Sequence, residues 1–284
     1  MNKKQSVALS SVFASIALTV LKLVVGLTTG SMGILSEAAH SFLDFGAALL
    51  TFFAVRVGDK EADESHHFGH EKIESVSALI ETGLLFLTSA WIIYEAVKRL
   101  STGKVEIEVT WYAFAVMAFS IIVDYSRSRA LKKVAKETKS QALEADALHF
   151  SSDILSSLTV IAGLIFVWLG IAKADAIAAI GVSLFVLRVG YSLGKRTIDV
   201  LVDTVPSGLS ERIIDLVQLV EGVIAIKRIR VRPAGITIFI DITITVSAKL
   251  SITKAHAISD KIENKIKNSI PEADITIHLE PHRF

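Results

Sequence analysis

The stretch SEAAHSFLDFGAALL, residues 36–50, carries His40 and Asp44 four positions apart within an apolar run. A second apolar stretch, EADALHFSSDILSSL, residues 144–158, repeats this spacing with His149 and Asp153. Residues four apart share one face of a helix, so each stretch directs an imidazole and a carboxylate the same way. A carboxylate in the middle of a membrane helix costs about 2.5–3.5 kcal/mol. Two such pairs therefore predict that a cation binds within the membrane.

The four side chains suit a particular class of ion. Two histidines and two aspartates make a plausible tetrahedral site for zinc or a similar divalent metal. One alternative is a structural polar network, although such a network would more naturally include Arg or Lys. Another is an intramembrane metalloenzyme, but a closed four-ligand site leaves no position for a hydrolytic water. The chain also contains no HExxH motif, and we predict a metal-binding protein that is not an enzyme.

Composition separates the chain into two parts. Of its 284 residues 51% are hydrophobic, and the mean hydropathy is +0.53. Long apolar runs continue to about residue 200, after which the pattern is that of a water-soluble domain. The formal net charge of +1 gives no reason to expect a nucleic-acid partner. The lack of cysteine excludes disulfides and thiolate metal sites.

The apolar part contains six stretches long enough to cross a membrane as helices, since about 20 residues are needed. They lie at residues 6–28, 32–57, 74–99, 109–131, 140–169 and 174–198. The fourth is the weakest, because Asp124 and Arg127 lie near its end. The first follows a short basic head but has no clear cleavage motif, so we interpret it as a retained span. The predicted fold is an α-helical membrane protein with six transmembrane helices (residues 1–203) and a C-terminal cytoplasmic α+β domain (residues 204–284).

Basic residues predict the orientation. They gather at the N-terminus and in the second-to-third and fourth-to-fifth loops, namely Lys3, Lys4, Arg56, Lys60, Lys72, Arg127, Arg129, Lys132, Lys133, Lys136 and Lys139. The opposite loops carry only Lys104 and Lys173. By the positive-inside rule both termini are cytoplasmic. The absence of an organelle signal favours the cell (inner) membrane of a prokaryote.

The ligand types predict a mechanism. An imidazole, with an ordinary pKa near 6.5, must lose its proton to bind a metal. Metal loading therefore releases protons, and protonation weakens the site. If the site faces the two sides in turn, the expected activity is proton-coupled antiport that exports a divalent cation. Glu37 and Asp146 lie roughly one turn from the two pairs and are candidates only for shaping the pathway.

The chain resembles the cation diffusion facilitator family of divalent metal exporters. Six spans, ligands four apart in spans two and five, and the stretch ADESHHFGHEKIES (residues 62–75), similar to the family's HxFGHxKxE signature, carry the resemblance. It implies a homodimer in membrane lipid that exchanges metal ions for protons. It implies zinc as the substrate and as a possible regulatory ligand, with no cofactor, because His40 stands where some broader-range relatives have Asp. The same antiport of iron, cobalt, cadmium or manganese stays open, as does a non-transporting membrane metal receptor.

The loop after span two offers a second candidate site. His66 and His70 are four apart with Asp63 one turn earlier, so a short helical turn could gather three ligands. The resemblance implies a loop metal site at these positions, and a solvated polar loop is the alternative. His67 falls outside the pattern. The resemblance also implies a charge pair at the membrane edge between Lys72 and Asp203.

Beyond residue 206 the pattern predicts a helix at 207–220, strands at 223–232 and 236–246, a helix at 253–269 and a strand at 273–281, with antiparallel pairing in a two-layer α+β domain. The family's version is ferredoxin-like and dimerises. The resemblance implies a regulatory metal site at Asp241, His256, His278 and Glu280. Lys227 and Asp241 stand where some relatives have histidines, so one shared metal or only solvated polar residues are the two expectations. His282 is expected to be solvated.

Overall fold

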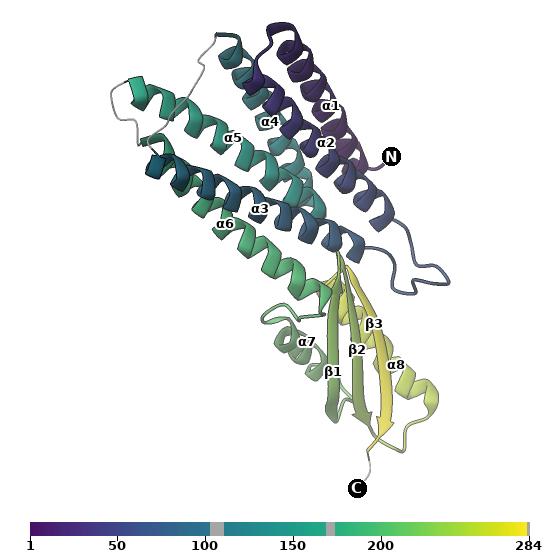
Figure 1. The fold of residues 1–284 in the computed structure, drawn as a ribbon. Helices are drawn as coiled ribbons and strands as arrows, with labels where there is room; N and C mark the ends of the chain where they lie inside the picture. Colours follow the sequence, from purple (N-terminus) through teal and green to yellow (C-terminus); the bar gives the residue numbers. More distant parts are fainter. Residues whose placement is uncertain (103–110, 169–173, 283–284) are drawn as a thin grey trace. The chain divides into compact units, whose positions relative to one another are not determined.

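The computed structural model describes residues 1–102, 111–168 and 174–282. The chain divides into two compact units, Met1–Thr197 and Ile198–Phe284. The predicted loops around Lys104 and Lys173 lie outside the described residues. Figure 1 shows helices in the first unit and a sheet with two helices in the second.

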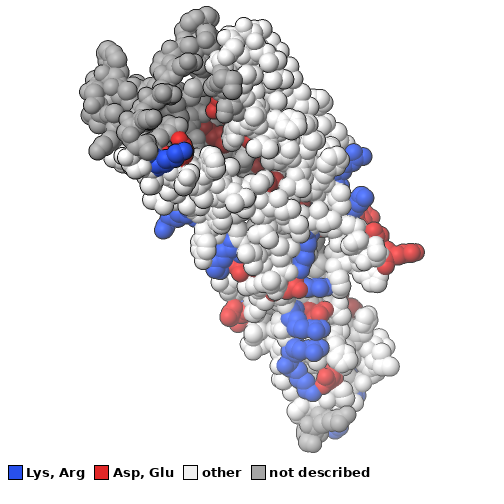
Figure 2. Space-filling view, in the orientation of Figure 1, with Lys and Arg blue, Asp and Glu red and all other residues white. Residues whose placement is uncertain are grey.

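Six long helices build the first unit, as predicted (Figure 1). They are α1 (Lys3–Thr29), α2 (Met32–Gly58), α3 (Lys72–Thr102), α4 (Trp111–Thr138), α5 (Gln141–Trp168) and α6 (Ala174–Leu201), which ends just beyond the unit boundary. Each has 27 to 31 residues, or roughly 40 Å at 1.5 Å per residue, which is enough to cross a bilayer. In the face shown in Figure 2, most of this unit carries no charged side chains, as lipid-facing surface requires.

Among the residues that the structure describes, four helical segments are long and apolar enough to cross a membrane by length and composition: Lys3–Thr29, Glu37–Gly58, Lys72–Lys98 and Ala176–Leu201. Helix α4 carries Asp124 and Arg127 within its span, and α5 carries Asp146 and Asp153. These charges lower the apolarity of both helices. Helices α4 and α5 also pack against each other.

The prediction that the basic residues between spans four and five form a loop is wrong. Helix α4 continues to Thr138, and α5 begins only three positions later, at Gln141. Arg127, which we expected near the loop, is buried inside the bundle. The other basic residues lie on the last turns of α4, where Ala, Leu, Lys and Glu all favour helix and nothing in the sequence stops it.

Small side chains let the helices approach closely. Ala8, Ala54 and Ala147 share a buried cluster with Leu143 and Phe150, drawn from α1, α2, α4 and α5. A Cβ on Gly26 of α1 would lie only 2.8 Å from the Leu35 side chain on α2, so glycine is needed there. Close approach of α2 and α5 is what brings the two His–Asp pairs together.

The second unit is the predicted two-layer α+β domain. It runs α7 (Leu209–Gln218), β1 (Ala225–Ala234), β2 (Thr237–Val246), α8 (Ile252–Ser269) and β3 (Ala273–Pro281). Strand β2 lies between β1 and β3 and is antiparallel to β1 but parallel to β3. The prediction of antiparallel pairing is therefore wrong for the last strand, because α8 returns the chain to the end where β2 began.

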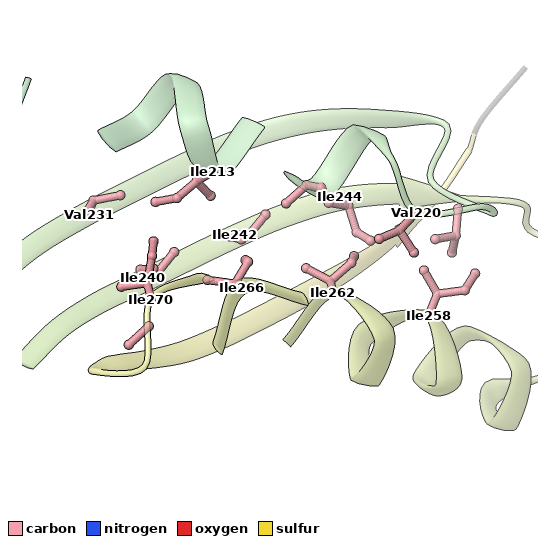
Figure 3. Packing of buried hydrophobic residues seen from close by; sticks show 13 residues of the cluster. Ile213, Val220, Val231, Ile240, Ile242, Ile244, Ile258, Ile262, Ile266 and Ile270 are labelled. Carbon is pink, nitrogen blue, oxygen red and sulfur yellow. The ribbon is translucent and has the colours of Figure 1, made fainter. Parts of the chain in front are cut away.

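Both helices and the sheet contribute to one core (Figure 3). Alternate residues Ile240, Ile242 and Ile244 of β2 face Ile213 of α7 and Ile262 of α8, and all five are almost fully buried. The period of two in β2 and of about four in α8 therefore produces a single apolar layer. Charged side chains are dense on the surface of this unit in Figure 2.

Candidate metal centre

The two predicted pairs converge from α2 and α5. Nε2 of His149 lies 3.0 Å from Oδ1 of Asp44 and 3.6 Å from Oδ2 of Asp153. Nε2 of His40 lies 3.7 Å from Oδ1 of Asp153 and 3.8 Å from Oδ1 of Asp44. Each histidine therefore contacts both carboxylates, one from its own helix and one from the other. Ligands on a tetrahedral ion about 2.1 Å away lie roughly 3.4 Å apart, close to these separations. Ligand atoms of His40, Asp44 and Asp153 all lie within 4.8 Å of one another, whereas His149 joins the site through its contacts with the two aspartates.

The four side chains differ in exposure. The side chains of His149 and Asp44 are 8% and 12% exposed, whereas the side chain of His40 is 42% exposed. The site is therefore reached at its His40 edge and closed at its His149 edge. Oδ2 of Asp153 is buried and accepts no hydrogen bond among the described residues. An orphaned carboxylate oxygen with two imidazoles beside it is suited to a cation, because burying an unpaired charge is costly.

A lysine that the sequence analysis missed lies beside this site. Lys22 of α1 is buried, and its ammonium donates to Oγ of Ser41 at 2.8 Å and to Oε2 of Glu37 at 3.2 Å. This pair accounts for Glu37, for which the sequence offered only a candidate role in shaping the pathway. A lone lysine in the apolar first span was the signal that could have found it.

Arg127 of α4 forms a second buried cationic centre. It donates to the hydroxyls of Ser11 and Ser15 on α1, at 3.0 and 2.6 Å, and to Asp124 at 3.2 Å. Its guanidinium carbon lies 3.6 Å from the ring centroid of Phe150. Ser11 also donates to the fully buried Asp146 at 3.2 Å. The site therefore lies within a polar network that ties α1, α4 and α5 together.

The loop after α2 gathers Asp63, His66 and His70, as the sequence predicted. One ligand atom from each lies within 4.8 Å of the others, with contacts of 3.3 Å from Asp63 to His66 and 3.4 Å to His70. The predicted helical turn is wrong: the segment is a loop, in which Asp63 accepts the backbone N–H groups of Ser65 and His66. His67 instead contacts the Glu64 carbonyl oxygen.

These loop hydrogen bonds also set the charge of the cluster. The Ser65 hydroxyl and the N–H groups of His66 and Ser65 hold the pKa of Asp63 well below its ordinary value. Asp63 therefore keeps its negative charge in mildly acidic solution. One carboxylate and two imidazoles at the observed separations form a second group able to bind a divalent cation.

Comparison with known proteins decides the family. Residues 8–202 match the cation efflux transmembrane domain, and residues 205–282 match the cytoplasmic domain of cation efflux proteins. The chain is 30% identical to a cation-efflux pump FieF of Yersinia enterocolitica, over 98% of this chain and 92% of the relative. It is 29% identical to a FieF of Yersinia pestis with the same coverage. The chain belongs to the cation efflux family.

This cation efflux protein is therefore a multi-pass membrane transporter of divalent cations with a cytoplasmic C-terminal domain, and not an enzyme. The resemblance to metal exporters is confirmed. Among solved structures, a nickel form of the MamM CTD covers 28% of this chain and 100% of its own, at 20% identity and a TM-score of 0.26. Another, MamM-CTD, covers 26% of this chain and 94% of its own, at 23% identity and a TM-score of 0.25.

The four candidate ligands of the transporter's cytoplasmic domain are not gathered within one described chain. Asp241 accepts from Arg230 at 3.0 Å, and His256 lies 3.6 Å from Asp260 on its own helix. His278 and Glu280 line a cavity of about 640 Å³ together with Lys227, Thr245 and His282. The Lys227 ammonium pairs with Glu280 there. Lys72 and Asp203 belong to different units, so their pairing stays a prediction.

Proposed function

We propose that this transporter exports zinc from the cytoplasm in exchange for protons, with His40, Asp44, His149 and Asp153 as its transport site. The observation that carries the proposal is the convergence of these four side chains between α2 and α5. Two nitrogen and two oxygen ligands are typical of zinc. Both imidazoles must be neutral to bind it, so loading at the cytoplasmic side expels protons and reprotonation at the other side expels the metal.

The assembly we propose is a homodimer in the cell (inner) membrane with both termini cytoplasmic. The C-terminal unit matches the family's cytoplasmic domain, and six helices return the chain to the side on which it began. The basic residues on the last turns of α4 support the same orientation. On this proposal the transmembrane domain ends at residue 203 and the cytoplasmic domain begins at residue 204.

Two further metal sites belong to the proposal. Asp63, His66 and His70 form a secondary site in the loop after α2, at which an arriving cation is held. Asp241, His256, His278 and Glu280 form a regulatory site only when a second protomer completes it, since one chain brings together only His278 and Glu280, at 4.0 Å. The Lys72–Asp203 charge pair at the membrane edge would hold the dimer or couple its two halves.

Metal choice is tested by stopped-flow flux into proteoliposomes under a fixed pH gradient, with zinc, cadmium, manganese, iron(II) and cobalt compared. Zinc is expected to move faster than manganese, because an imidazole-containing site disfavours a metal that prefers oxygen ligands. Equal rates for the two metals would leave the export activity standing but overturn the choice of zinc. Loss of all flux on replacement of either aspartate, with the dimer intact, excludes a purely structural role.

A further inference from the structure

Lys22 brings a cationic side chain from α1 to the part of α2 that carries the transport site. Its side chain is 7% exposed, and the ammonium donates to Oγ of Ser41 at 2.8 Å and to Oε2 of Glu37 at 3.2 Å. A buried ammonium is costly unless it is paired, so these two bonds fix where the charge lies. Glu37 differs from its partner, because 52% of its side chain is exposed. The pair therefore joins a buried cation to an open carboxylate.

Both partners of Lys22 lie on the face of α2 that carries two of the metal ligands. Glu37 precedes His40 by three residues, and Ser41 precedes Asp44 by three. Residues three or four apart are neighbours on a helix surface, with Cβ atoms about 5–6 Å apart. The side chain of His40 is also exposed, at 42%, like that of Glu37. The carboxylate of Glu37 therefore lies one helical turn from the open edge of the quartet.

An unpaired carboxylate at this position would suit a metal ion. Zinc accepts carboxylate oxygens, and some zinc sites expand from four ligands to five. The two aspartates of the quartet are balanced either by a divalent cation or by the two imidazole protons for which it is exchanged. Glu37 adds a negative charge that neither of these balances. Without a counter-charge of its own, Glu37 would therefore hold a cation that has to leave.

We infer that Lys22 neutralises Glu37 and so keeps this carboxylate from becoming a fifth ligand that retains the exported cation. On the proposed orientation α2 runs inward from the outer side of the membrane, so Glu37 lies one turn outward of His40, where the cation leaves. Lys22 is a positioning residue, because it acts on the metal through Glu37. The inference rests on the proposed function and adds a residue that sets how tightly the transport site holds its substrate.

The test is a double-mutant cycle on zinc binding by the purified full-length protein, with His70→Ala throughout to remove the loop site. Lys22→Met should bind zinc about tenfold more tightly and release it to a chelator about tenfold more slowly, a change of the size that supporting groups bring to metal sites. Glu37→Gln should bind about tenfold more weakly, because Lys22 then stands unpaired beside the ion. The double variant should return to wild-type affinity, and Lys22→Arg should keep it.

The matched control is Lys3→Met. Lys3 also lies on α1 and pairs with a carboxylate on another helix, Glu137 of α4. It lies roughly 28 Å along the helix from Lys22, at 1.5 Å per residue, so its removal should leave zinc affinity and release unchanged. The binding step that belongs to the quartet is identified as the one that Asp153→Asn removes.

Wild-type or weaker zinc binding in Lys22→Met overturns the inference, and the weaker binding is what a merely structural lysine would give. A gain in affinity that persists when Glu37→Gln is added also overturns it. If Lys22→Met does not fold, Glu37→Gln decides the matter, since its exposed side chain can change without loss of packing, and an unchanged affinity there overturns the inference. Zinc binding that fully survives Asp153→Asn would instead overturn the proposed transport site, which distinguishes the two failures.

Discussion

Replacing each transport-site aspartate by asparagine should separate metal affinity from apo-protein stability. Asp44 accepts a 3.0 Å hydrogen bond from His149, whereas Oδ2 of Asp153 accepts none among the described residues. Both carboxylates face both imidazoles, so either Asp44→Asn or Asp153→Asn removes one charged ligand. Replacement of a group that merely orients a ligand costs 10–100-fold in affinity. Loss of a ligand should therefore weaken zinc binding at the quartet by at least ~100-fold, or about 2.8 kcal/mol.

The metal-free forms of the two variants should differ in thermal stability. Asp44→Asn exchanges a hydrogen bond to a charged acceptor, worth about 1.5–3 kcal/mol, for a neutral one worth about 0.5–1.5. The apo protein should lose about 1 kcal/mol, or about 2–4 °C in Tm for a unit of this size. Asp153→Asn loses no hydrogen bond, because its contacts of 3.6 and 3.7 Å to the histidines are too long for one, and it should melt like the wild type.

The assay is zinc titration calorimetry together with thermal melting of the metal-free protein in detergent. The loop site is removed in all proteins by His70→Ala, so that the heats report the quartet. Wild-type affinity in either variant would refute the proposed ligand set. Equal melting temperatures for the two apo variants would show that the His149–Asp44 hydrogen bond does not distinguish the two carboxylates.

Three further predictions concern the loop and the cytoplasmic domain. Hydrogen bonds from Ser65 and His66 hold the pKa of Asp63 low, so any stability they give the loop is present above about pH 3.9 and lost only as the pH falls through the lowered pKa. Zinc binding by the loop should instead weaken in acid because protons compete with the metal for the imidazole nitrogens, as titration of an Asp44→Asn background would report. Ile262→Ala should cost about 2–5 kcal/mol and speed amide exchange across β2, since Ile262 is fully buried; wild-type exchange would contradict the assigned core. Gly222→Ala should cost about 1–2 kcal/mol in chemical denaturation, because φ is +100° and the new Cβ would lie 2.6 Å from Ile258; an unchanged midpoint would refute this packing.

Local patterns predicted most of the fold. Apolar runs of helical length gave the six helices, and alternation at residues 236–246 gave β2, because both depend on which faces are buried. The direction of β3 was missed, since pairing antiparallel or parallel depends on where α8 delivers the chain. The continuation of α4 was missed as well, because the basic residues after Arg127 were interpreted as a loop although they favour helix.

The site was predicted in part for similar reasons. The spacing of the two His–Asp pairs places ligands on a helix face, and the structure brings these faces together; their role as metal ligands stays a prediction. The roles of Lys22 and Arg127 were not predicted, because Lys22 donates to side chains on α2 and Arg127 donates to hydroxyls on α1. Arg127 contacts Ser11, 116 positions away, and Lys22 contacts Ser41, 19 positions away. No local pattern encodes such contacts.

The central claim is that metal moves outward in exchange for protons, and one flux measurement tests it directly. Inside-out proteoliposomes, with the cytoplasmic face exposed, should take up zinc faster when the lumen is acidic, because protons leaving the lumen drive the metal in. Collapse of the gradient by a proton-exchanging ionophore should slow uptake, and Asp153→Asn should abolish the gradient-dependent part. Zinc uptake at the same rate with and without the gradient would contradict the account.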